Sequence, residues 1–161
     1  MIESLPSSNT ISNDLRLVRG ISAASVFSLV IYVLVAHLAG QELQSQFALT
    51  EEQRTVWRTV FYVIAIVTLP LTNLIRHVQL RLNQTMPGEM PARNRYLVTV
   101  LVSMALVETL GIYGLIMFIL GDDFNTLYIL MGMSALGMFL YRPKLEEYTA
   151  ILQALSKPLK L

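Results

Sequence analysis

The sequence predicts an all-α integral membrane protein, a four-helix bundle with both termini in the cytoplasm and a short amphipathic C-terminal tail. Three observations lead to this fold class. Of the 161 residues, 54% are hydrophobic and only 14% are charged, an unusual balance for a soluble domain. The hydrophobic residues gather into four long runs, and most basic residues gather on one side of those runs.

The four apolar runs are the predicted membrane spans, at residues 21–39, 59–75, 96–120 and 124–141. A helix rises 1.5 Å per residue, so the runs extend over about 26 to 37 Å, enough for a hydrocarbon core of ~30 Å. A helix of a soluble bundle would carry a stripe of polar residues on its solvent face. None of the four runs has a stripe of charged residues, so we interpret them as membrane spans. The first run lacks the charge placement of a cleaved secretory signal. We therefore expect a transmembrane domain at 21–141, a cytoplasmic segment at 1–20 and a cytoplasmic or interfacial tail at 142–161.

The charges predict the orientation of these spans. Ten of the twelve basic residues flank the runs on one side: Arg16, Arg19, Arg76, Arg81, Arg93, Arg95, Arg142, Lys144, Lys157 and Lys160. The other side holds Arg54 and Arg58 among several carboxylates. By the positive-inside rule the basic side is cytoplasmic, which predicts a multi-pass protein of the cell inner membrane.

Local sequence signals agree with the division into spans. Thr50 to Gln53 has the pattern of a capping box, which predicts that the second helix begins before its apolar run. Gly121, Asp122 and Asp123 predict a tight outer turn between the last two spans.

The tail repeats apolar residues at helical spacing from Leu145 to Leu159. This pattern is typical of a helix lying on the inner leaflet, with lysines near anionic headgroups. It is equally typical of a frayed extension of the last span that packs on the protein itself.

Small residues predict where helices approach closely. They recur on the first, third and fourth runs, at Gly20, Ala24, Ser28, Gly111, Gly114, Gly132 and Gly137. Packing within one chain explains most of them, and packing between copies or with other membrane subunits stays open.

Glu108 is the strongest single signal for function. It is the one charged residue deep inside a run, midway along the third. A charge there costs about 3 kcal/mol on insertion scales, so the side chain is expected to be protonated, ion-bound or hydrogen-bonded. Residues predicted near the same depth include Ser28, Tyr32, Thr68 and Ser134.

The stretch from Glu108 to Ile116, ETLGIYGLI, resembles the ion-carrying helix of the proteolipid (c) subunits of rotary ATPases. The resemblance covers this helix and not the rest of the chain. It implies that Glu108 takes up a proton or sodium ion, that Tyr113 can hydrogen-bond it, and that the hydroxyl of Thr109 contributes as in sodium-binding members.

Other function classes have little support in the sequence. No cysteine is present, and His37 and His77 are predicted at opposite faces of the membrane, without metal-ligand spacing. No phosphate loop or dinucleotide motif occurs, and a net charge of +1 does not favour nucleic acid. We expect no enzyme, cofactor or metal site. Two classes remain: an ion-coupled component that uses Glu108, or a structural or accessory subunit in which Glu108 only makes an interhelical hydrogen bond.

Overall fold

The computed structural model describes residues 8–85 and 90–156, with side chains from residue 11 onward. The described residues form five α-helices and no strand, which confirms the all-α prediction. The helices are α1 (Ser8–Phe47), α2 (Glu51–Thr85), α3 (Ala92–Ile119), α4 (Phe124–Leu140) and α5 (Leu145–Ser156). Lys157, Lys160 and the outer parts of the predicted segments 1–20 and 142–161 lie outside the described residues.

Three of these helices, α1, α2 and α3, are long and apolar enough to cross a membrane. α4 has 17 residues and qualifies only together with α5, from which it is bent by 45°. Each of the first three helices extends beyond its predicted apolar run, most clearly α1, which continues to Phe47. This length and composition indicate a membrane protein with several spans.

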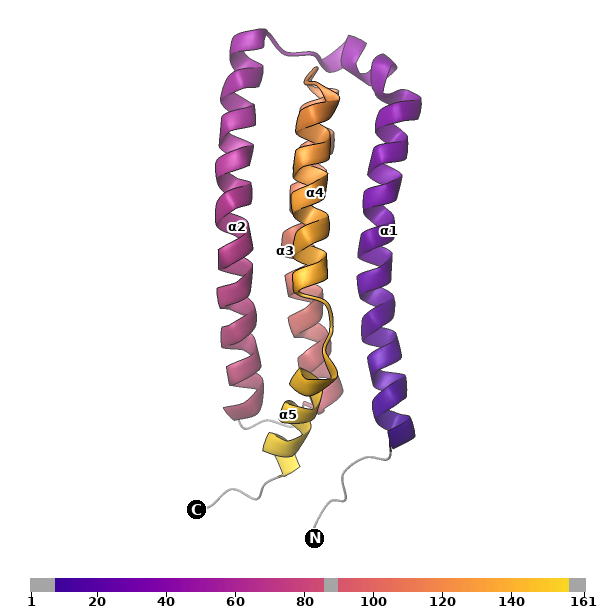
Figure 1. Cartoon of the computed structure of the whole chain (residues 1–161), viewed down its shortest axis with the longest axis vertical. Coiled ribbons are helices and arrows are strands. Elements are labelled where there is room, and N and C mark those ends of the chain that lie inside the picture. The colour runs from indigo at the N-terminus through magenta and orange to yellow at the C-terminus, as the bar shows by residue number, and fades with distance from the viewer. Residues whose placement is uncertain (1–7, 86–89, 157–161) are drawn as a thin grey trace.

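α3 is the central helix of the chain, with α1 and α2 on either side of it (Figure 1). In its most apolar stretch 44% of the residues are buried, compared with 11% in α1 and in α2. The two flanking helices expose large apolar side chains such as Phe27, Leu38 and Ile66. Such faces are unfavourable in water and suit the hydrocarbon of a bilayer.

One of the two bonds of the predicted capping box is present at the start of α2, and the Thr50 hydroxyl donates to Gln53 Oε1 at 3.1 Å. The backbone N–H of Thr50 donates a hydrogen bond to Gln53 Oε1 at 3.3 Å, and α2 begins at Glu51. The prediction of an early helix start is therefore confirmed.

The turn between α3 and α4 is also as predicted. Gly121 has φ of +94°, a left-handed conformation that favours glycine, and Asp123 Oδ1 accepts from the Thr126 N–H at 3.1 Å. Asp122 is buried and pairs with Arg58, whose Nε lies 2.8 Å from Asp122 Oδ2. Burial raises the pKa of Asp122, but the hydrogen bonds from Arg58 and neighbouring groups outweigh it and bring the pKa below its ordinary value.

Three of the predicted packing glycines lie at close contacts between helices of this chain. A Cβ on Gly114 would lie 3.1 Å from the Leu127 carbonyl oxygen, and one on Gly137 would lie 2.7 Å from Val107 Cγ1. Gly111 makes a similar close approach to α1, described below. Around Gly20 and Gly132, in contrast, the space is open.

The tail forms a helix of its own, separate from α4. α5 packs against α2 and α3 at the end of the molecule where α2 ends and α3 begins (Figure 1). Its Tyr148 and Ile151 are buried, and Tyr148 Oη donates to Asp14 Oδ2 at 2.6 Å. The tail thus packs on the protein itself, as one of the two interpretations expects, but as a separate helix and not as an extension of the last span.

Candidate functional site

Glu108 lies in the middle of α3, half-buried on the side that faces α1. Its Oε1 lies 2.6 Å from Ser28 Oγ and 3.1 Å from Tyr32 Oη. Ser28 and Tyr32 are four residues apart, so they stand one above the other on the same face of α1. Two hydroxyl groups of one helix therefore meet the carboxyl group of another.

Gly111 allows α1 to come this close. It lies three residues after Glu108 on the same side of α3, and a Cβ at this position would stand 2.5 Å from Leu29 Cδ2. Leu29 follows Ser28 directly and is buried. The missing side chain of Gly111 thus makes room for Leu29, and this brings the Ser28 hydroxyl within reach of Glu108.

The Ser28 hydroxyl has one hydrogen and two acceptors close to it. Its oxygen lies 2.7 Å from the Ser25 carbonyl oxygen and 2.6 Å from Glu108 Oε1. It can donate to only one of them. If it donates to Ser25, its lone pair accepts a hydrogen from a protonated Glu108; if Glu108 is ionised, Ser28 and Tyr32 both donate to the carboxylate. The site provides hydrogen-bond partners for either protonation state.

The polar partners of Glu108 are neutral. Among the described residues the ion pairs are Arg58–Asp122, Arg76–Glu147 and Arg93–Asp14, and none of them includes Glu108. In hydrocarbon an uncompensated carboxylate is costly. A neutral carboxylic acid, or a carboxylate with a bound cation, fits these surroundings.

The other residues predicted near Glu108 have different partners. Thr68 is half-buried on α2 and donates to the Ile64 carbonyl, while Ser134 donates to the backbone carbonyl of Val107 at 2.7 Å. The Ser134 hydroxyl therefore bonds to the backbone next to Glu108 and not to the carboxyl group.

The two residues implied by the proteolipid resemblance also lie elsewhere. Thr109 Oγ1 donates to the Leu106 carbonyl at 2.6 Å, and the ring of Tyr113 stacks on Phe61 of α2 at 4.8 Å between centroids. Five residues of helix turn a side chain about 140° away, so Tyr113 faces α2 while Glu108 faces α1. The hydroxyl groups beside the carboxyl come from α1 instead.

A second polar cluster lies near the basic end of the molecule, and the sequence did not predict it. Arg76 of α2 is 4% exposed, and its Nη2 lies 2.6 Å from Glu147 Oε2 of α5. Tyr96 Oη lies 2.9 Å from the same oxygen, and Ser103 Oγ accepts from Arg76 Nη1 at 3.2 Å. In the sequence analysis Arg76 served only as one of the basic residues that predict the orientation of the spans. The available signal was an arginine directly after an apolar run together with an oppositely charged residue in an amphipathic tail at the same end.

Comparisons with protein-family models, with curated proteins and with solved structures give no match to this chain. The resemblance of residues 108–116 to rotor proteolipids therefore stays a prediction.

Proposed function

We propose that this chain is a multi-pass protein of the cell inner membrane, a four-helix bundle with cytoplasmic termini that works within a larger membrane assembly. Glu108 is its H⁺ or Na⁺ site. The observation that carries the proposal is a carboxyl group at mid-helix whose polar partners, among the described residues, are the hydroxyls of Ser28 and Tyr32. Intramembrane carboxyl groups of this kind are functional by default.

The arrangement of the helices supports the membrane topology. The α1–α2 and α3–α4 connections lie at one end of the molecule, and the start of α1, the end of α2, the start of α3 and α5 lie at the other (Figure 1). The second end carries most of the basic residues, as the positive-inside rule requires of a cytoplasmic face. In this proposal α4 is the fourth span, and Glu108, midway along α3, lies near mid-membrane.

The hydrogen bonds of Ser28 support a simple proton exchange. When Glu108 binds a proton, the carboxylic acid donates to Ser28 Oγ and the Ser28 hydroxyl donates to the Ser25 carbonyl. When the proton leaves, the Ser28 hydroxyl rotates toward Glu108 and joins Tyr32 as a donor to the carboxylate. Alternatively, Na⁺ takes the place of the proton, with the oxygens of these three side chains as ligands. The carboxylate-plus-hydroxyl chemistry is similar to that of rotor proteolipids.

Labelling with dicyclohexylcarbodiimide tests this proposal, because this hydrophobic reagent reacts with protonated carboxyl groups in apolar surroundings. We expect the protein purified in mild detergent to be modified at Glu108, identified by peptide mass, with more modification at lower pH. Sodium protects the residue if sodium is the ion. Glu108→Gln removes the label, and Glu42→Gln, at an exposed carboxyl of α1, leaves it in place. Glu108 that stays unreactive at every pH would overturn the proposal.

The alternative function is a structural or accessory subunit. One observation favours it: the bonds from Ser28 and Tyr32 join α1 to α3, and α1 is otherwise a mostly exposed flanking helix. In that case Glu108 stays protonated and acts as an interhelical clamp. Glu108→Gln, which keeps a neutral hydrogen-bonding side chain, would then preserve both assembly and activity of the complex that co-purifies with the chain.

A further inference from the structure

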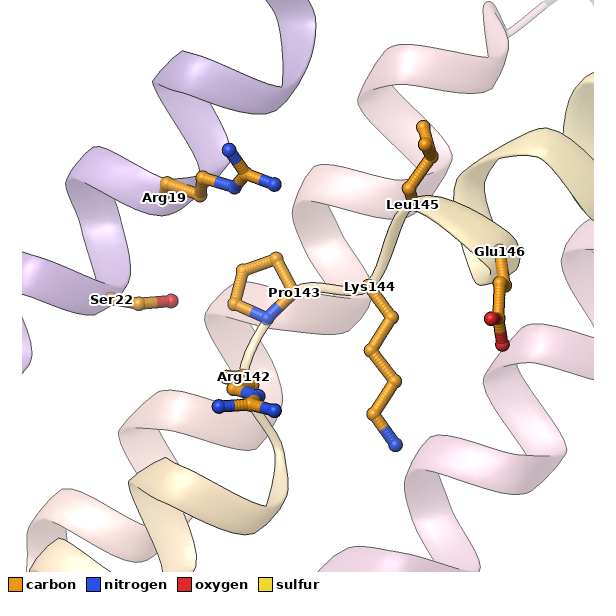
Figure 2. Close-up of a pocket in the computed structure, with 7 residues that line it drawn as sticks. All are labelled: Arg19, Ser22, Arg142, Pro143, Lys144, Leu145 and Glu146. Atoms are coloured by element: carbon orange, nitrogen blue, oxygen red, sulfur yellow. The ribbon is translucent and has the colours of Figure 1, made fainter. Parts of the chain in front are cut away.

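A groove of about 700 Å³ opens at the basic end of the molecule, between α1 and the connection from α4 to α5 (Figure 2). It lies apart from Glu108 and borders the Arg76 cluster, since the backbone N–H of its lining residue Lys144 donates to Tyr96 Oη at 2.8 Å. Its lining residues are Arg19, Ser22, Arg142, Pro143, Lys144, Leu145 and Glu146. Arg19 projects from α1 toward the connection, and Pro143 stands between it and Arg142 (Figure 2).

The charge of this groove is unbalanced. It has three cationic side chains and one carboxylate, Glu146. Within the described part of the chain no carboxylate lies within ion-pair distance of Arg19, Arg142 or Lys144. The Arg142 guanidinium lies 4.7 Å from the centre of the Phe139 ring, where it keeps its hydrogen-bond donors available. An anion would meet little competition from the protein's own acids.

Two exposed apolar side chains lie one helical turn from the groove, toward the middle of the molecule. Val26 lies one turn beyond Ser22 on α1, and Phe139 lies one turn before Arg142 on α4, and both are at least half exposed. At the far end the helices are joined, since Tyr128 Oη lies 3.2 Å from His37 Nε2. The groove itself is thus polar and cationic, and exposed apolar side chains of both helices lie one turn beyond it.

We propose that this groove binds the phosphate headgroup of an anionic phospholipid from the inner leaflet. Arg19 and Arg142 bind the phosphate oxygens, Lys144 adds a point charge, and the Ser22 hydroxyl donates a hydrogen bond. The acyl chains lie along Val26 and Phe139. The inference rests on the membrane orientation proposed above, in which this end is cytoplasmic, and basic pockets between helices on that side are suited to anionic headgroups.

Native mass spectrometry of the full chain, released from mild detergent with added lipid, tests the site. Phosphatidylglycerol is the probe, and phosphatidylcholine and inorganic phosphate are the comparisons. We expect phosphatidylglycerol to be retained in preference to phosphatidylcholine. The double variant Arg19→Gln/Arg142→Gln should bind it roughly 25-fold more weakly, about fivefold for each arginine. The matched control Arg16→Gln/Arg81→Gln removes two exposed arginines at the same end that do not line the groove, and should bind normally.

Each other outcome overturns the proposal. Equal retention of phosphatidylcholine by the unaltered protein shows that no anionic site exists, whatever the variants do. Equal loss in both double variants shows general attraction to the basic end. Inorganic phosphate that binds in the groove while phosphatidylglycerol does not shows a free-phosphate site. Carbodiimide labelling of Glu108 is measured in the same samples, so failure of the lipid site is separable from failure of the ion site.

Discussion

Glu108 and Glu147 are two glutamates at helix contacts, and they differ in what surrounds them. Each has one carboxylate oxygen near two donors from other helices. For Glu147 one donor is the buried guanidinium of Arg76, so the charge is compensated within the protein. For Glu108 both donors are hydroxyl groups, which satisfy hydrogen bonds and leave the charge uncompensated.

This difference separates a structural ion pair from a site that can change its charge. The Arg76–Glu147 pair joins α5 to α2 and is stable only while both members are ionised, because either one alone would be a buried charge. Glu108 has no such partner, and its surroundings suit a neutral acid or a bound cation. Three substitutions test the contrast, in order of expected effect.

Glu147→Gln should have the largest effect on stability. It leaves the Arg76 guanidinium, 4% exposed, without a compensating charge, and we expect a loss of about 3 kcal/mol in the free energy of unfolding. Denaturation of the purified protein in mixed micelles, followed by circular dichroism, measures it. Glu146→Gln alters the adjacent exposed carboxylate and should cost little. Equal effects of the two substitutions would show that the Arg76–Glu147 ion pair does not add to the free energy of unfolding.

Tyr32→Phe should have an intermediate effect. It removes one hydrogen bond to Glu108 and should cost about 1 kcal/mol in the same unfolding experiment, with a change in the rate of carbodiimide labelling. Tyr113→Phe is the matched control, because the Tyr113 ring keeps its stacking on Phe61. If Tyr113→Phe changes the labelling rate and Tyr32→Phe does not, Tyr113 is the tyrosine that bonds to Glu108 in the membrane, as the proteolipid resemblance implies. The assignment of Tyr32 is then wrong.

Glu108→Gln should have the smallest effect on stability, below about 1 kcal/mol. The amide is neutral and, like the protonated carboxyl group, can donate a hydrogen bond to Ser28 Oγ, so a protonated glutamic acid and glutamine are nearly equivalent here. The same micelle denaturation series measures it beside Glu147→Gln. A loss as large as that of Glu147→Gln would mean that Glu108 is held as a charged group, and the contrast between the two sites would fail.

Most of the helical architecture was predictable from local signals. The apolar runs, the capping box at Thr50 and the turn at Gly121 each depend on residues close together in the chain, and the helices occur where these signals place them. The position of Glu108 midway along α3 also followed from counting along its run, and its depth in the membrane stays a prediction. Ser28 and Tyr32 were predicted at this depth together with Thr68 and Ser134, and depth alone did not separate the four.

The partners of each side chain depend on how the helices are rotated and packed. Ser28 and Tyr32 meet Glu108 because Gly111 admits α1 on that side of α3, and Tyr113 is turned to α2 by its position five residues on. Arg76 and Glu147, 71 residues apart, meet only because α5 folds back beneath α2. The apolar runs and the charges specify the helices and their environment from the chain alone, since both are local properties. Contacts between distant residues are set by packing, and so only the tertiary structure separated a compensated glutamate from an uncompensated one.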